Sequence, residues 1–354
     1  EEMTDREACI LLNAVPGIPP RTKHRLLEAL GSPAAVVRAS REALAEFVTE
    51  HTAERIAAFC TARDPETLRI EAESVGARLV ALVDLEYPPL LRPLPDPPLA
   101  LYIRGSLPEA PHVAVVGTRR PSADGMEVGR RLAADLAAAG VCVVSGLARG
   151  IDAAAHRGAL EAGGLTVAVL GCGIDRIWPA EHGDLLEQVA EHGAVLSEYP
   201  PGTPPLRHHF PARNRILAAL SRAVVVVEAR ERSGALLTAE FALDLGREVF
   251  AVPGCVLNPR SRGPHQLLRE GAHLAESAED VLSLLGIPPR APRTAPPLRE
   301  AEAALVALLE EPCHLDELVR ATGQHPAAVA ALLVALEVRG IVRRLAGGRY
   351  VRAG

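Results

Sequence analysis

The chain has 354 residues, of which 48% are hydrophobic and 23% are charged, and its formal net charge at pH 7 is −6. This composition predicts a folded protein of about two or three domains and excludes an intrinsically disordered chain. The negative net charge also excludes a nucleic-acid binder that works by bulk positive charge, although a locally basic cleft can still attract an anion.

The cysteines and the N-terminal residues bear on the compartment. The six cysteines are widely separated and form no CxxC pair, which argues against both a zinc site and a disulfide framework. The first ten residues, EEMTDREACI, lack a signal-peptide pattern, and the longest apolar stretch, at 327–336, is too short to span a membrane. We therefore expect a cytoplasmic protein that needs no metal ion and no other cofactor.

Residues 1–78 are predicted to form a domain of short helices of the SAM or helix-hairpin-helix type. Within it, 13–33 reads NAVPGIPPRTKHRLLEALGSP, which indicates a helix, a tight Pro-Gly turn and an amphipathic helix. Such a hairpin can present backbone N–H groups to a phosphate at the N-terminus of its second helix. An ordinary hairpin that packs on its neighbour is the simpler interpretation, and we favour it over direct DNA contact.

Residues 79–285 alternate between apolar strands and helices. The predicted strands are continuous Val, Ala and Leu runs at 112–117, 141–146, 166–171, 194–198, 223–229 and 248–254. Continuous rather than alternating apolar runs are typical of strands buried on both faces, as in a parallel sheet. Helical stretches, for example 126–140 and 235–246, separate them. The pattern predicts a doubly wound, mostly parallel, Rossmann-like α/β sheet.

The last part of the chain is predicted to be a separate domain. Residues 286–299 are proline-rich and indicate a linker. In 300–354, three helical stretches at 302–311, 314–323 and 325–340 precede a hairpin at 341–352, which is the outline of a winged helix. Five arginines and no acids lie between Val338 and Arg352, which suits a wing that touches phosphates. A protein-contact module is an equally good interpretation.

Unusual polar loops follow the predicted strands of the central domain. They lie at 117–125, 145–152, 171–179, 198–215 and 228–240. Ligands of open parallel sheets bind at the carboxyl ends of the strands, where small residues allow close backbone approach and helix N-termini attract anions. These loops therefore predict a phosphate-binding edge of the sheet.

The loops do not match the common enzyme motifs. No G-x-G-x-x-G follows the first of these strands, no G-x-x-x-x-G-K-[ST] occurs, and the histidines show no metal-ligand spacing. Ser145 and Ser233 follow strands, but neither lies in a G-x-S-x-G elbow. We predict neither a metal site nor a catalytic residue.

An aromatic side chain stands in the most basic loop. From Tyr199 to Val227 there are four arginines, two histidines and no acids, with Phe210 near the centre, although aromatics are only 3% of the chain. A cation-lined groove with an exposed ring is how single-stranded nucleic acid is held, because charge follows the backbone and the ring stacks on a base. The alternative is that Phe210 fills the core, with Arg213 and Arg215 bound to carbonyls or acids at the end of the sheet. Beside the phosphate-binding loops we favour stacking.

These motifs resemble those of the DprA/Smf family of DNA-processing proteins. The matching segments occur in the family's order over about 87–275 and include VAVVGTRRPS, SGLARGIDAAAH, GCGIDRIWP, SEYPPGTPP, FPARNRI and GPHQLLREGA. The resemblance implies a dimeric, non-enzymatic single-stranded DNA-binding protein of natural transformation. It would protect incoming strands and load the RecA recombinase onto them, and a single-strand-binding protein is a further partner that the resemblance allows.

The resemblance also implies site residues. Arg119, Arg207 and Phe210 would contact the DNA backbone and bases, and main-chain amides would reach the phosphates at Gly117, Ser145, Gly146, Gly171 and Gly173. The rest of the predicted nucleic-acid-binding set is Arg120, Ser122, Arg213, Asn214, Arg215, Ser233 and Gly234. The family motifs differ at Trp178, His182 and His265, so we assign no contact to either histidine. For the dimer, residues 263–274 are the candidate contact.

The competing class is an enzyme. Nucleotide phosphoribohydrolases on a related fold place a Gly-Gly-x-Gly-Thr loop and a catalytic glutamate after a late strand, where this chain has Ser233 to Thr238 and Glu240. The Gly-Gly pair is absent, and a nucleotide-cleaving enzyme has little use for Phe210 in a long basic loop. We therefore prefer the binding protein.

Overall fold

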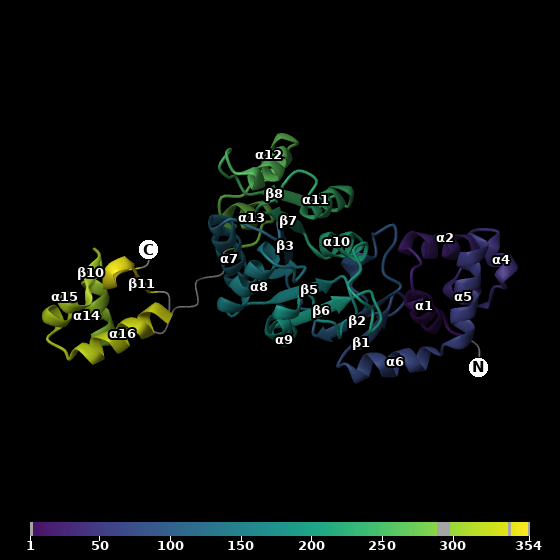
Figure 1. The fold of residues 1–354 in the computed structure, drawn as a ribbon, viewed down its shortest axis with the longest axis horizontal. Helices are drawn as coiled ribbons and strands as arrows, with labels where there is room; N and C mark the ends of the chain where they lie inside the picture. The colour runs from purple at the N-terminus through teal and green to yellow at the C-terminus, as the bar shows by residue number, and fades with distance from the viewer. Residues whose placement is uncertain (1–2, 289–297, 339–340, 353–354) are drawn as a thin grey trace. The chain divides into compact units, whose positions relative to one another are not determined.

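The computed structural model describes residues 3–288, 298–338 and 341–352 (Figure 1). The chain folds into two compact units, which divide between residues 289 and 290. Most of the predicted linker, 286–299, lies outside the described residues. In the part of the chain that the structure describes, no helix is both long and apolar enough to cross a membrane.

The first unit begins with the predicted short helices. They are α1 (Asp5–Ala14), α2 (Pro20–Leu30), α3 (Pro33–Arg38), α4 (Arg41–Ala45), α5 (Glu50–Ala62) and α6 (Pro65–Ser74). Side-chain oxygens cap the N-termini of five of them, from Thr4, Ser32, Ser40, Thr49 and Asp64, as expected for Ser, Thr and Asp before a helix. The predicted hairpin is confirmed as α1 and α2.

These helices share a core with the sheet that follows. Leu26 and Ile56 belong to the same buried apolar cluster as Tyr102 and Leu170 of the central sheet. The helical region and the sheet are therefore parts of one compact unit, although the sequence predicts a domain boundary between 78 and 79.

The central sheet has nine strands within the described residues, in the order β1-β2-β6-β5-β4-β3-β7-β8-β9. Their bounds are β1 Arg78–Ala81, β2 Ala100–Gly105, β3 His112–Val116, β4 Cys142–Ser145, β5 Thr166–Leu170, β6 Gly193–Ser197, β7 Ala223–Val226, β8 Glu248–Ala251 and β9 His273–Leu274. All six predicted strands form, and β3 to β9 are parallel. The strands β1 and β2 add an antiparallel edge next to β6, which the strand prediction did not include.

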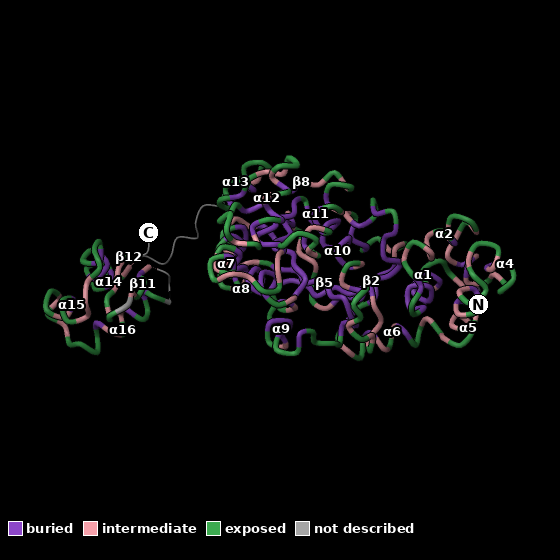
Figure 2. The backbone as a smooth tube through the Cα atoms, turned by 45° about the horizontal axis from the view of Figure 1, so that its top comes forward, coloured by how far each residue is buried: buried purple, intermediate pink, exposed green. Residues whose placement is uncertain are grey.

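Helices cover both faces of the sheet, as the sequence predicts. Their bounds are α7 Ala123–Ala138, α8 Ile151–Glu161, α9 Gly183–Glu191, α10 His209–Leu220, α11 Gly234–Asp244, α12 Arg262–Arg269 and α13 Ala278–Leu284. Successive side chains of a strand point to opposite faces: Val113 and Val115 pack with α7, α8 and α13, whereas Ala114 and Val116 pack with α10, α11 and α12. Buried backbone accordingly concentrates in the strands and the inner sides of these helices (Figure 2).

The strand order places a switch point at β3. From β3 the chain builds β4, β5 and β6 on one side, then crosses to add β7, β8 and β9 on the other. In open α/β sheets the crevice outside the carboxyl ends of the strands at such a point is where ligands bind.

The second unit is the predicted winged helix. It contains α14 (Glu300–Ala307), β10 (Cys313–His314), α15 (Leu315–Thr322), α16 (Pro326–Val338), β11 (Val342–Arg344) and β12 (Arg349–Arg352). The strands pair in the order β10-β12-β11, so the predicted hairpin gains a short third strand. Leu305, Leu309, Leu318, Leu333 and Val342 form its core.

Candidate nucleic-acid interface

A cavity of about 960 Å³ opens at the carboxyl edge of the sheet, beside the switch point. Its lining comes from all five predicted loops: Arg119 after β3, Ala148 after β4, Trp178 after β5, Arg207 after β6 and Ser233 after β7. The first and the last of these loops, at Arg119 and Ser233, are more than 100 residues apart along the chain. The parallel sheet brings all five together because these strands end at one edge. The five loops therefore meet at one edge of the sheet, as the sequence predicts.

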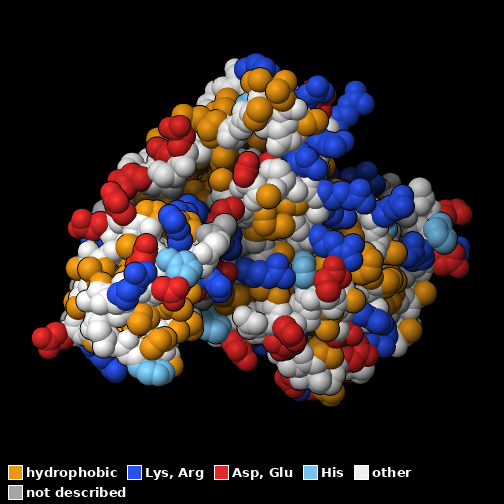
Figure 3. Space-filling model, turned by 60° about the vertical axis from the view of Figure 1, so that its left-hand side comes forward, with side chains coloured by type: hydrophobic (Ala, Val, Ile, Leu, Met, Phe, Trp, Pro, Cys, Tyr) orange, Lys and Arg blue, Asp and Glu red, His pale blue; other side chains and the backbone are white. Residues whose placement is uncertain are grey.

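The cavity is lined by arginine. Five partly or fully exposed arginines contribute, namely Arg119, Arg120, Arg207, Arg230 and Arg260. Within the described residues, none of these five forms a salt bridge with an acid; the cavity arginine that does is Arg213, which faces Asp152. Figure 3 shows Lys and Arg side chains gathered in a broad band across one face. On a chain of net charge −6, this lining makes the cavity locally positive.

Phe210 forms part of the cavity wall and lies outside the buried apolar clusters. Its half-buried ring lies over Gly171, where an added Cβ would stand 2.9 Å from Phe210 Cδ1. The guanidinium carbon of Arg119 lies 5.1 Å from the centre of the ring, a distance at which a cation is attracted to an aromatic face. The core-filling alternative therefore does not describe this ring, which combines an aromatic face with a neighbouring cation.

Arg213 is a buried cation in the cavity wall. Its side chain donates from Nη1 to the carbonyl oxygens of Gly146, at 2.7 Å, and Val169, and the carboxylate of Asp152 lies 3.8 Å from Nη2. Burial lowers the pKa of Arg213 and raises that of Asp152. A Cβ at Gly146 would lie 2.2 Å from Arg213 Nη2, so glycine here makes room for the guanidinium. Arg213 is therefore bound to carbonyls at the end of the sheet, as the alternative to a DNA contact proposed. It also lines the cavity.

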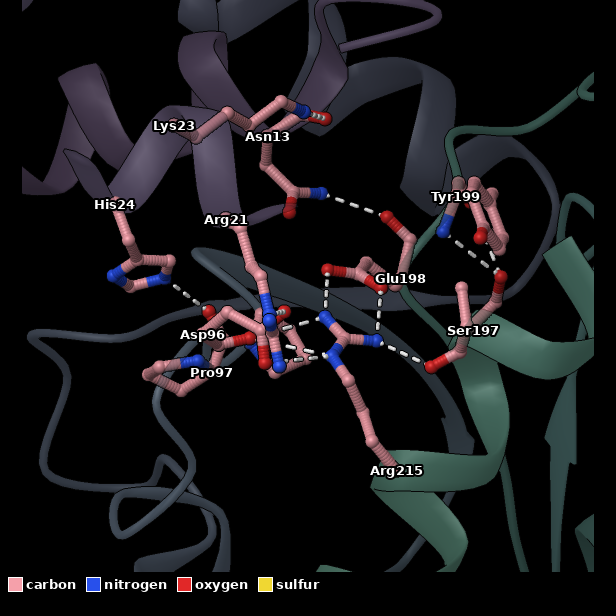
Figure 4. A network of polar contacts seen from close by, with 12 residues as sticks. Asn13, Arg21, Lys23, His24, Asp96, Pro97, Ser197, Glu198, Tyr199 and Arg215 are labelled. Atoms are coloured by element: carbon pink, nitrogen blue, oxygen red, sulfur yellow. Dashed lines mark hydrogen bonds and ion pairs between the residues drawn. The ribbon is translucent and has the colours of Figure 1, made fainter. Parts of the chain in front are cut away.

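Arg215 is placed differently from the prediction. It is absent from the cavity lining, and its buried guanidinium donates to both carboxylate oxygens of Glu198, at 2.9 and 2.7 Å, and to the carbonyl of Asp96. Figure 4 shows this network at the junction with the N-terminal helices, where Asn13 Nδ2 donates to the Glu198 carbonyl at 2.8 Å. Arg215 therefore joins parts of the fold. The acid-free segment that suggested a DNA contact starts at Tyr199. Glu198, the partner of Arg215, lies one residue before that segment.

The remaining predicted residues divide into two groups. Those that line the cavity, besides the arginines and Phe210, are Gly117, Asn214, Ser233 and Gly234. Those that do not are Ser122, Ser145, Gly146, Gly171 and Gly173. The second group supports the walls: Ser122 caps α7, the hydroxyl of Ser145 donates to the Val115 carbonyl at 2.7 Å, and the Gly173 amide donates to Thr203 at 2.9 Å. Because this amide already has an acceptor, a phosphate would have to displace it.

The two unassigned histidines hold loops. His182 is buried, and its Nδ1 lies 2.8 Å from the carbonyl oxygen of Leu147. The amide of Leu147 donates to Nε2 of the fully buried His156 at 3.3 Å. Leu147 has a positive φ of 56°, a left-handed conformation that leucine rarely adopts, and these two contacts fix its peptide groups beside the cavity loop. His265 Nε2 lies 3.0 Å from the Gly254 carbonyl.

The lining residues that were not predicted as site residues include Arg230, Trp178 and Arg260. Arg230 lies in the predicted loop 228–240, and Trp178 lies in the predicted loop 171–179, so loop position alone could have suggested both. Arg260 follows β8, in a segment that no motif marked, and its Nε donates to the carbonyl of Arg120.

The acid of the enzymatic alternative lies outside the cavity. Glu240 is exposed on α11 and does not belong to the lining, and the acid that does, Asp152, faces Arg213. Across the described ranges, no group of three or more His, Cys, Asp or Glu side chains is arranged to hold a metal ion.

The fold and the cavity together define a doubly wound α/β protein with an arginine-lined cavity, a helical N-terminal region and a winged helix. Residues 78–286 match the family model described as DNA recombination-mediator protein A, residues 288–348 match the DprA winged helix domain, and residues 10–60 match the SAM-like helix-hairpin-helix tandem. The chain belongs to the DNA recombination-mediator protein A family, also called DprA/Smf.

Named relatives and solved structures agree. The putative DNA processing protein DprA of Mycobacterium tuberculosis is 42% identical, with 93% of this chain and 90% of that protein covered. Protein Smf of Escherichia coli is 42% identical, with 75% of each covered. The structure of DprA from Streptococcus pneumoniae superposes with a TM-score of 0.70 at 36% identity, covering 80% of this chain and 98% of that one. DNA processing protein A from Helicobacter pylori, described for its single-stranded DNA binding mode, matches with a TM-score of 0.54 at 31% identity, covering 60% and 97%.

Proposed function

We propose that this protein binds single-stranded DNA in the arginine-lined cavity, without sequence preference and without cleaving it. The observation that carries the proposal is the meeting of five arginines with the Phe210 ring in one cavity. Non-specific single-strand binders combine a positive groove along the backbone with aromatic rings that stack on bases of any identity.

Each kind of side chain has a part in this binding. Arg119, Arg207 and the neighbouring arginines contact phosphates, and the planar guanidinium suits bidentate contacts to phosphate oxygens. Ser233 and Gly234 lie at the start of α11, where the backbone N–H groups of a helix N-terminus also favour an anion. Phe210 supplies the stacking surface for a base.

Membership of the family supports a proposal for the cellular role. We infer that the protein works in the cytoplasm, protects DNA strands that have been taken up or processed, and loads RecA onto them. A single-strand-binding protein is a further partner. The relatives named for DNA processing and the Helicobacter protein described for single-stranded DNA binding support this role.

The protein is proposed to act as a homodimer through its α/β body. Residues 263–274 include α12 and the edge strand β9, and the nearby Val256 and Leu257 are 79% and 87% exposed. An edge strand with exposed apolar neighbours is suited to pairing with a second copy. Sedimentation should show a dimer at micromolar concentration and a monomer for Leu257→Glu. A monomeric parent protein would contradict the assembly.

The experiment that tests the binding function compares fluorescently labelled single-stranded and blunt duplex oligonucleotides of equal length by anisotropy. We expect tighter binding to the single strand and little dependence on its sequence. Equal or tighter binding to the duplex would contradict the proposal. In parallel, incubation with nucleoside monophosphates tests the enzymatic alternative, since a phosphoribohydrolase would release free base.

A further inference from the structure

Trp178 is an exposed aromatic side chain that the proposed function has not used. It is the only tryptophan of the chain, its side chain is 47% exposed, and it lines the same cavity as Phe210. Among the described aromatic residues, one other, Phe47, is comparably exposed, at 37%, and it lies in the N-terminal helical region away from the cavity. An exposed indole adds little to a core, but its face can stack on a base.

The loop that carries Trp178 is bonded to the loop that leads to Phe210. The amide of Gly173 donates to the Thr203 carbonyl at 2.9 Å, and the amide of Gly202 donates to Asp175 Oδ1 at 2.8 Å. Arg176 Nη2 adds a third bond, to the Gly202 carbonyl at 3.3 Å. The two rings are therefore carried by segments that support each other.

The other end of the Trp178 loop is also held. Glu181 forms an ion pair with Arg149, and the buried His182 contacts the Leu147 carbonyl. A ring on a loop fixed at both ends loses little conformational freedom when a ligand binds, which keeps the cost of binding low.

The two rings are separate surfaces of one large cavity. The ring contacts found within the described residues pair Tyr199 with His209, His208 with His209, and Phe250 with His273, so Trp178 and Phe210 do not touch. A volume of about 960 Å³ lies at the top of the range of about 300–1,000 Å³ for small-molecule sites. The cavity has space for more than one base.

We propose that Trp178 is a second base-stacking platform, which holds the base next to the one on Phe210, so that the cavity takes a dinucleotide unit of single-stranded DNA. The inference rests on the proposed function and adds to it a site size and a second base-contacting residue. The phosphate between the two bases then lies among the arginines of the lining.

The first test uses Trp178→Ala with oligo(dT) in the anisotropy assay. A stacking contact of about 1–3 kcal/mol per base corresponds to a loss of affinity of about 5- to 150-fold, at every salt concentration and with an unchanged salt slope, because no charge is removed. Trp178→Phe, which keeps an aromatic face, should recover part of the affinity. Phe47→Ala is the matched control and should bind like the parent. Circular dichroism should show all variants folded, since neither side chain is buried.

The second test uses the single tryptophan as its own reporter. Oligo(dT) should change the indole emission of the parent protein, and Trp178→Ala should weaken binding of the dinucleotide pTpT while leaving that of thymidine monophosphate unchanged. Equal weakening for both ligands would mean that the two rings hold the same base and would overturn the two-base arrangement. A parent that binds oligo(dT) with no emission change, together with a Trp178→Ala protein of parental affinity, overturns the inference alone. A parent that does not bind oligo(dT) overturns the proposed function.

Discussion

Removing the Phe210 ring is expected to weaken single-strand binding without changing the electrostatic part of it. The ring is half-buried against Gly171 and Arg119 and belongs to no buried apolar cluster. Phe210→Ala should lose about 1–3 kcal/mol of stacking per base, which is a drop in affinity of about 5- to 150-fold. The same substitution removes no charge, so the slope of log affinity against log salt should remain that of the parent.

Stability separates this role from core filling. Truncating a fully buried Phe costs about 3–5 kcal/mol, and the partly buried position of Phe210 predicts a smaller loss. Phe59→Ala is the matched control, because Phe59 packs partly buried against the core of the N-terminal region, and its loss should lower stability but not affinity. The assays are anisotropy of labelled oligo(dT) at four salt concentrations and chemical denaturation. A Phe210→Ala protein that binds with the parental affinity would refute the stacking role. If that protein has also lost about 3–5 kcal/mol of stability, the ring belongs to the core.

Three further predictions test the surroundings of the cavity. Removal of residues 290–354 should leave single-strand affinity within a few-fold of the parent, because every cavity residue lies in the first compact unit; loss of binding by a folded truncation would move the site to the tail. Arg215→Ala should lower the free energy of unfolding by about 3–5 kcal/mol, since it leaves the buried Glu198 unpaired, and the salt slope of binding should stay parental; a flatter slope would mean that Arg215 contacts phosphate after all. Burial lowers the pKa of His156 to about 3. Between that pH and about 6.5, the ordinary pKa of histidine, the unfolded chain therefore binds more protons than the folded one. The free energy of unfolding should fall in this range by about 1.4 kcal/mol for each pH unit of acidification. In chemical denaturation His156→Gln should show a shallower decline, and parallel declines would contradict the assignment.

Much of the fold could be predicted because its strands are buried on both faces. Short, continuous apolar runs between helices, such as 112–117 and 223–229, are typical of parallel strands, and each of these two runs contains one. The antiparallel strands β1 and β2 were missed although 79–83 and 99–103 are also continuous apolar runs. No α-helix separates these two strands, so they do not fit the alternation of strands and helices from which the sheet was predicted. The strand β9 has two residues, too few for any periodic signal.

The site could be predicted in part, for a related reason. Strand ends mark the edge where loops meet, so Arg119 and Ser233 could be brought together without a structure. Which arginines face the cavity depends on partners that are distant in sequence. Arg215 pairs with Glu198 and the Asp96 carbonyl, whereas Arg260 enters from the segment after β8, and neither position follows from loop composition.

The most direct test of the account is the salt dependence of oligo(dT) binding by the parent and by Arg207→Ala. Each lost contact between an arginine and a single-strand phosphate should reduce the slope of log affinity against log salt by about 0.7. The account predicts that the parent prefers the single strand to an equal blunt duplex, and that Arg207→Ala binds more weakly with a slope flatter by about that amount. A parent with no preference for the single strand, or an Arg207→Ala protein with the parental affinity and slope, would contradict the claim that this cavity holds single-stranded DNA.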